Sequence, residues 1–125
     1  MEQLFGVLHG FEVITRPTVF LYMVGGFLTG VLFAAIPGLT GTLAIALLLP
    51  VTYTLDISTS LVMCASIFMG GQYGGSITAI TVNIPGAPSA VMTAFEGNIL
   101  MRRGEGANAL RQAALASAFG GVIGA

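Results

Sequence analysis

The sequence contains very few charged residues. Only 7% of its 125 residues are charged and 55% are hydrophobic, whereas about a quarter of the residues in an average soluble domain carry charge. Residues 17–55 and residues 57–95 have no charged side chain. Because about 20 helical residues cross the hydrocarbon core of a bilayer, each stretch has room for one full crossing and a second segment. The composition predicts an all-α integral membrane protein.

The sequence also lacks the residues that several kinds of site require. The only cysteine is Cys64, so the chain cannot form an internal disulfide or a thiolate metal site, and we interpret this residue as a small buried hydrophobe. The only histidine, His9, has no partners for catalysis or metal binding. The formal net charge of −1 argues against a nucleic-acid partner. No basic region and cleavage site of a secretory signal occur at the N-terminus, which we treat as mature sequence.

Residues 1–16 have the pattern of an amphipathic helix. Apolar side chains recur at helical spacing, at Leu4, Val7, Leu8, Phe11 and Ile14. We expect this helix to lie in the membrane interface. Pro17 suits the first turn of the next helix, which is predicted to cross the membrane over residues 18–36. Gly26 and Gly30 on it form a small-xxx-small pattern that favours close helix packing.

A first break in the helical pattern is predicted at residues 37–42. Pro37 and Gly38 end the first crossing, and a short apolar run follows as far as Pro50. This run is too short for a comfortable crossing, so it predicts either a re-entrant half-helix or a helix that kinks at Pro50 and continues. The start of this segment would direct unpaired N–H groups and the hydroxyls of Thr40 and Thr42 into the protein, an arrangement that favours anion binding.

A second break is predicted at residues 70–89. This uncharged stretch contains two interleaved small-xxx-small pairs, Gly70/Gly74 and Gly71/Gly75, and then Pro85-Gly86 and a second short apolar run. The pattern of the first break is thus repeated. A pair of interrupted hydrophobic segments is the best sequence pointer to the binding site of a secondary transporter.

The remaining polar positions predict topology. Asp56 is interpreted as a helix cap rather than as a coupling-ion ligand. Residues 96–112 contain three of the four basic residues and are predicted to form a cytoplasmic loop. If Arg16 is also cytoplasmic, the number of crossings between it and this loop should be even. Residues 113–125 are predicted to begin a further transmembrane helix, truncated where this sequence ends.

The motifs resemble one known family, the tripartite tricarboxylate transporters, and within it the large membrane subunit, the TctA-type permeases. The resemblance covers essentially the whole chain and rests on motifs in a specific order: Ala35-Ile36-Pro37-Gly38-Leu39, Leu48-Leu49-Pro50, Gly70-Gly71-Gln72-Tyr73-Gly74-Gly75-Ser76-Ile77, Asn83-Ile84-Pro85-Gly86-Ala87-Pro88-Ser89, Glu96-Gly97, Arg103-Gly104 and Ala109-Leu110. The sequence departs from the family at Phe68-Met69, where a tyrosine-rich pair is expected before the glycines, and in one place where the departure affects the expected structure. It has Glu96-Gly97-Asn98-Ile99 where the family usually shows Asp-Gly-Tyr-Pro, so the turn set by that proline is not expected here.

The resemblance implies a multi-pass permease subunit of the bacterial inner membrane. Such a permease is an ion-gradient-driven symporter that takes a tricarboxylate or related carboxylate from a periplasmic solute-binding protein and works with a small membrane subunit. Full-length members are much longer and contain an internal repeat. The chain is therefore expected to be the N-terminal part of the first half of an inverted-repeat transporter, and not an enzyme.

The predicted solute site consists of backbone N–H groups and hydroxyls at the two breaks, because the one charge within the membrane region, Asp56, has the wrong sign to hold an anion. The predicted substrate-binding residues are Gly38, Thr40, Gly41, Gly75, Ser76, Asn83, Gly86 and Ser89. Carbonyl groups freed near Pro37 and Pro85, with Asn83 and the threonines, are predicted to bind a coupling cation, Na⁺ or H⁺. No other cofactor or metal is expected.

Two other functions were weighed. An intramembrane hydrolase with Ser76 as nucleophile is disfavoured, because the sequence after Gly74 lacks the second glycine of a nucleophile elbow and nothing brings His9 close. The alternative is a non-transporting membrane assembly module in which the glycines serve helix packing only. That alternative predicts that Ser76, Asn83 and Ser89 can each be replaced by alanine without loss of function.

Overall fold

The computed structural model describes residues 1–124, and these residues form helices and connecting turns without any strand. The all-α class predicted from the sequence is therefore confirmed. The elements are α1 (Glu2–Ile14), α2 (Pro17–Ala34), α3 (Gly41–Thr52), α4 (Ile57–Val82), the short 3₁₀ helix η1 (Pro88–Ala90), α5 (Val91–Arg102) and α6 (Gly106–Gly124).

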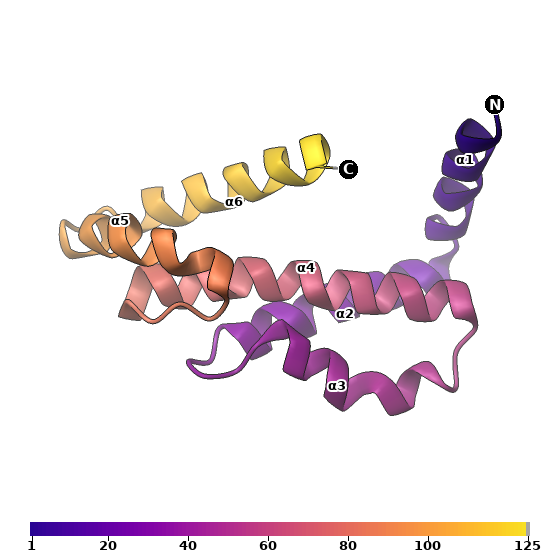
Figure 1. Cartoon of the computed structure of the whole chain (residues 1–125), viewed down its shortest axis with the longest axis horizontal. Helices are drawn as coiled ribbons and strands as arrows, with labels where there is room; N and C mark the ends of the chain where they lie inside the picture. The colour runs from indigo at the N-terminus through magenta and orange to yellow at the C-terminus, as the bar shows by residue number, and fades with distance from the viewer. Residues whose placement is uncertain (125) are drawn as a thin grey trace.

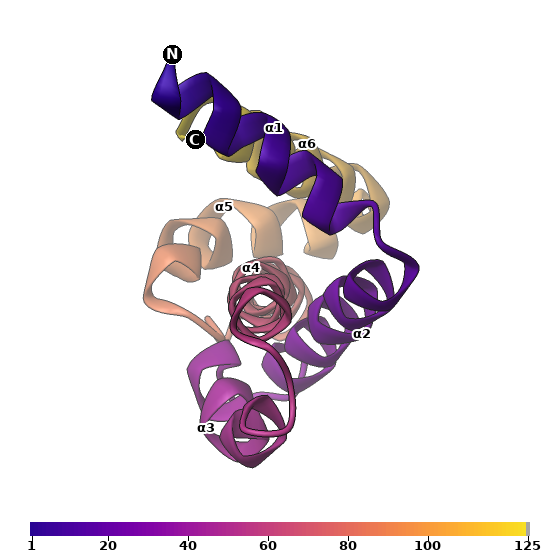
Figure 2. The same cartoon turned by 90° about the vertical axis from the view of Figure 1, so that its right-hand side faces the viewer.

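Helix α4 is the centre of the structure. It packs against α2, α3, α5 and α6, and the view along its axis in Figure 2 shows α2, α3 and α5 arranged around it. The chain direction in Figure 1 shows α2 and α4 running the same way and α3 running back between them in sequence. The helices that follow the two proline-glycine breaks, α3 and α5, both pack against α4.

Glycines bring α2 and α4 into backbone contact. Gly26 and Gly30 of α2 are buried against α4. A methyl group placed on Gly26 would lie 2.9 Å from the carbonyl oxygen of Met63, and one placed on Gly74 would lie 2.5 Å from that of Val31. The predicted packing role of the Gly26–Gly30 pair is confirmed.

Local sequence signals set the helix starts. Pro17 occupies the first turn of α2, as predicted. The Thr40 hydroxyl caps α3 by accepting a hydrogen bond from the Leu43 N–H at 3.2 Å. Asp56 caps α4 by accepting from the Thr59 N–H at 3.1 Å and from the Thr59 hydroxyl at 2.6 Å, which confirms its predicted capping role. Helix α3 continues past Pro50 for only two residues, to Thr52.

Within the described residues, α2 is the one helix that is both long and apolar enough to cross a bilayer. Only 22% of it is buried in the structure. Large apolar side chains cover its outer surface, among them Phe20, Leu21, Leu28 and Leu32. Helix α4 is longer, at 26 residues, but its glycines and hydroxyl residues lower its mean hydropathy.

Two predicted boundaries were wrong. Residues 70–82, predicted as part of a break, lie within the uninterrupted helix α4, and the second break is limited to residues 83–87. Residues 96–112, predicted as a loop, are helical except for residues 103–105, where Gly104 adopts a φ of +82°. Glu96 and Asn98 accordingly lie inside α5 rather than in a turn. The charged side chains of this segment are exposed, but charge does not determine whether the backbone is helical.

If α4 crosses a membrane, the helix directions predict an odd rather than an even number of crossings between Arg16 and Arg103. The α1–α2 junction and the α5–α6 junction lie near opposite ends of the α4 axis (Figure 1). If α4 crosses the membrane, Arg16 and Arg103 face opposite sides. Because three of the four basic residues lie in or beside the α5–α6 junction, the positive-inside tendency then predicts that this end is cytoplasmic and that Arg16 lies on the opposite side.

This topology leads to a first prediction. In the full-length protein, a single cysteine replacing Arg16 is expected to react with a membrane-impermeant maleimide added to intact spheroplasts, whereas one replacing Arg103 should react only after the membrane is permeabilised. The background variant Cys64→Ser provides the control. Labelling of both positions from the same side would restore the even number of crossings.

Candidate solute site at the two helix breaks

The first break returns to the middle of α4. Gly41 at the start of α3 and Gly71 of α4 are both buried, and a methyl group on Gly71 would lie 2.6 Å from the Cα atom of Gly41. A methyl group on Gly41 would lie 2.9 Å from the Cα atom of Gly71. The N-terminus of α3 is thus held in backbone contact with α4, about halfway along that helix.

The second break folds back onto the same helix, one turn further along. Asn83 ends α4 in a left-handed conformation with a φ of 61°, which reverses the chain. Gly86 is buried and its N–H donates a hydrogen bond to the Gly75 carbonyl at 3.4 Å. A methyl group on Gly86 would lie 2.8 Å from the Ala34 carbonyl oxygen and 2.8 Å from the Gly75 Cα atom. This break is therefore wedged between α4 and the end of α2.

The two interleaved glycine pairs of α4 contact different partners. Gly70 and Gly74 face the α2 backbone at Phe27 and Val31, whereas Gly71 and Gly75 face the two breaks at Gly41 and Ala87. Neighbouring positions on a helix are rotated by about 100°. One run of small residues therefore makes two contact faces, one for helix packing and one for the breaks.

A small cavity lies where the breaks meet α4. Its volume is about 70 Å³, and it is lined by Thr40, Gly41, Thr42, Phe68, Gly71, Gln72, Ala87 and Pro88. At about 30 Å³ per water molecule, it has room for about two water-sized groups. That volume suits a single carboxylate group, and it is below the roughly 300 Å³ at which sites for whole small molecules begin.

No charged side chain lines this cavity. The polar groups that border it are the N-terminus of α3, the hydroxyls of Thr40 and Thr42, and the Gln72 amide. The first N–H groups of a helix lack intrahelical acceptors, and the helix dipole adds a partial positive charge at that end. The local field therefore favours a negatively charged group without a salt bridge.

The predicted site residues divide into two groups. Thr40 and Gly41 line the cavity, and Gly75, Gly86 and Ser89 lie in the second break or directly against it. The other three lie elsewhere. Gly38 is an exposed turn residue with a φ of +92°, and no atom lies near the position that a side chain would take. The Ser76 hydroxyl donates a hydrogen bond to the Gln72 carbonyl at 3.4 Å. Asn83 is the exposed residue at which α4 ends. Whether any of them binds solute stays a prediction.

Sequence reasoning missed Gln72. Its side-chain oxygen accepts a hydrogen bond from the Ser89 hydroxyl, which joins the middle of α4 to the second break. The signal was present in the sequence, because Gln72 is a flexible polar side chain in the centre of an uncharged segment rich in glycine. An amide in that position needs hydrogen-bond partners.

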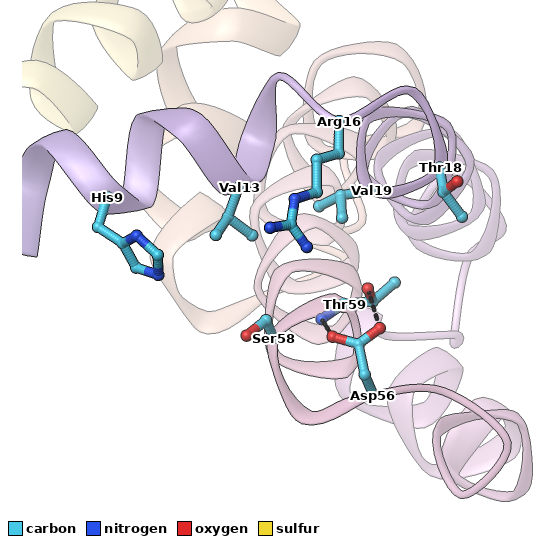
Figure 3. Close-up of a pocket in the computed structure, with 8 residues that line it drawn as sticks. All are labelled: His9, Val13, Arg16, Thr18, Val19, Asp56, Ser58 and Thr59. Carbon is cyan, nitrogen blue, oxygen red and sulfur yellow. Dashed lines mark hydrogen bonds between the residues drawn. The ribbon is translucent and has the colours of Figure 1, made fainter.

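A larger cavity of about 350 Å³ lies at the N-terminal end of α4, beside the α1–α2 junction. Figure 3 shows its lining, with Arg16 extending toward the hydrogen-bonded pair of Asp56 and Thr59. The Thr59 hydroxyl, with the Thr59 N–H, holds the pKa of Asp56 below its usual value, so this carboxylate is charged at neutral pH. Groups of opposite sign border this cavity, and none of the predicted solute-binding residues does. The described residues contain no group of three potential metal ligands.

Apolar helices packed through glycines, with an uncharged cavity between two helix breaks, are features typical of helical membrane transport proteins. The model of the tripartite tricarboxylate transporter TctA family matches residues 20–125, and the chain belongs to that family. The resemblance noted from the motifs is thereby confirmed.

One curated relative extends this comparison. The chain is 41% identical over 123 residues to an uncharacterized 52.8 kDa protein in the TAR-I ttuC' 3' region of Agrobacterium vitis. The match covers 98% of the chain and 24% of the relative, so the chain spans about a quarter of that protein's length. No solved structure matches the chain.

Proposed function

We propose that the chain forms part of the permease subunit of a binding-protein-dependent secondary transporter, which imports tricarboxylates or related carboxylates across the bacterial inner membrane. Membership of the TctA family supports the transport role. The observation that carries the proposal for this chain is the uncharged cavity at which the N-terminus of α3 and the second break meet the middle of α4.

In this proposal the cavity binds one carboxylate group of the solute. The α3 N-terminus and the Thr40 and Thr42 hydroxyls supply donors, and the remaining groups of the solute contact parts of the permease outside this chain. Binding without a buried salt bridge suits transport, because the solute must also leave the site and a fully paired buried charge is hard to separate. The location halfway along α4 agrees with the midplane sites of secondary transporters.

The coupling cation, Na⁺ or H⁺, is proposed to bind at the carbonyl ends of the interrupted helices. The Ala34 carbonyl at the end of α2 lies against Gly86, and α4 ends nearby at Asn83. Helix C-termini carry partial negative charge and unpaired carbonyl groups, which are ligands for a hard cation. The periplasmic solute-binding protein and the small membrane subunit are proposed partners on the basis of the family alone.

The proposal is tested by transport measurements. Cells that express the full-length permease with its binding protein are expected to take up radiolabelled citrate or another carboxylate. Thr42→Val keeps the side-chain shape but removes a hydroxyl at the cavity, and it should raise the KM about tenfold or more, the usual effect of losing one hydrogen bond to a charged group.

The matched control is Thr29→Val. Its hydroxyl donates to the Gly25 carbonyl within α2, away from both breaks and outside both cavities, so uptake should stay at the wild-type level. Equal uptake by the two variants would favour the assembly-module alternative for these hydroxyls. Absence of carboxylate uptake by the wild-type protein would refute the proposed function itself.

A further inference from the structure

Gln72 differs from the serine and threonine side chains in the second half of α4. The hydroxyls of Ser76, Thr78 and Thr81 all donate to carbonyl groups of their own helix. Gln72 instead reaches off the helix to Ser89, which lies 17 residues later in the sequence. Its side chain therefore connects two elements and does not serve α4 itself.

The hydrogen bonding of this amide is only half complete. A glutamine side chain offers one acceptor oxygen and an NH₂ group with two donors. Ser89 occupies the oxygen, and among the described residues no acceptor is hydrogen-bonded to the Gln72 Nε2 atom. Gln72 also lines the cavity together with Thr40, Gly41 and Thr42. The side chain that carries the two unused donors is thus one of those that line the cavity together with the start of α3.

We propose that Gln72 determines the specificity of the site for a carboxylate, and that Ser89 is its positioning residue. The inference rests on the proposed transport function and names the residue that recognises the solute. Ser89 holds the amide oxygen, so the NH₂ group is the part left to bind. A carboxylate accepts from both sides of the cavity at once, from the amide on one side and from the α3 N-terminus on the other.

A neutral amide also accounts for selectivity. Because Ser89 occupies the amide oxygen, only the NH₂ group is left to bind. An NH₂ group donates to an anion, whereas an ammonium group has only donors and finds no acceptor there. Because the amide carries no net charge, it binds a carboxylate less tightly than an arginine would. Recognition and release are then both possible at one site.

The test uses the full-length permease with its binding protein and compares the KM and maximal rate of citrate uptake at matched membrane levels. Gln72→Glu keeps the side-chain size but replaces two donors with a negative charge, and it should raise the KM at least tenfold. The loss should be larger for a tricarboxylate than for a monocarboxylate. Gln112→Glu makes the same chemical change on the exposed surface of α6 and should leave uptake unchanged.

The role of Ser89 is tested in a double-mutant cycle. Ser89→Ala should raise the KM about threefold in the wild-type background and have no further effect in a Gln72→Met background, because Ser89 acts through Gln72. A purely structural role would instead lower the membrane level and the maximal rate with an unchanged KM. Wild-type KM values in Gln72→Glu, together with impaired Thr42→Val, would overturn this inference while the proposed function stands. No carboxylate uptake by the wild type would remove both.

Discussion

Gly30→Ala is expected to separate α2 from α4 and to destabilise the protein by about 3 kcal/mol or more. The added methyl group would overlap the Ile67 carbonyl oxygen and lie 2.9 Å from the Gly71 nitrogen. These contacts are backbone atoms of α4, which cannot move aside as a flexible side chain does. Overpacking in a well-packed interior costs about 1–3 kcal/mol even where side chains can adjust, so a clash with a helix backbone lies at or beyond that limit.

The matched control for this prediction is Gly25→Ala, five positions earlier on the same helix. Nothing lies within 4 Å of a methyl group placed on Gly25, and alanine is favoured over glycine in a helix by about 1 kcal/mol. Thermal unfolding in detergent should therefore show a lower Tm for Gly30→Ala and an equal or higher Tm for Gly25→Ala. The glycine packing described for α2 and α4 is wrong if the two variants have the same Tm.

Gly71→Ala is expected to abolish carboxylate uptake, with a loss of at least a hundredfold. A methyl group on Gly71 would lie 2.6 Å from the Gly41 Cα atom, so the start of α3 must move away from α4. That shift would displace Thr40 and Thr42 from the cavity. A displacement of about 1 Å at a binding constellation can cost a factor of about a hundred.

Its neighbour Gly70 separates the effect on the site from the effect on folding. A methyl group on Gly70 meets the α2 backbone at Phe27 and not the breaks, so Gly70→Ala should lower the amount of folded protein. Gly71→Ala should leave α2 packed on α4 and lower uptake per molecule. Uptake is measured against membrane level for both variants, and a normal rate per molecule in Gly71→Ala would exclude Gly71 from the site.

Much of the fold follows from the sequence, and the exceptions have physical reasons. The uncharged stretches predict apolar helices, and the prolines at positions 37 and 85 predict where helices stop. The continuity of α4 through residues 70–82 was not predicted, because glycine-rich segments have low intrinsic helix propensity. Backbone packing against α2 and the two breaks compensates for that propensity, and such tertiary contacts cannot be derived from the segment alone.

The candidate site was predicted in part for a similar reason. Proline, glycine and hydroxyl residues indicated which segments meet, and Thr40 and Gly41 do line the cavity. Gly38 and Asn83 belong to the same polar and glycine-containing segments, but they form the turns of the backbone, as their positive φ values show. Gln72 was not predicted because its importance comes from its hydrogen bond to Ser89, which lies 17 residues later in the chain. The spacing of residues in sequence does not contain that pairing.

The glycine contacts of α4 also affect how its neighbours can move. Where side chains interdigitate, one helix slides past another only after several rotamers change, so such interfaces have a few discrete positions. The contact between Gly41 and Gly71 has no side chain on either surface. Translation of α3 along α4 there is opposed by backbone van der Waals contacts alone, each worth only about 0.1–0.2 kcal/mol. Side chains interlock further along α3, where Ala44 packs with Met63 and Ile67, so the contact at the α3 N-terminus has less intrinsic friction than the rest of the interface.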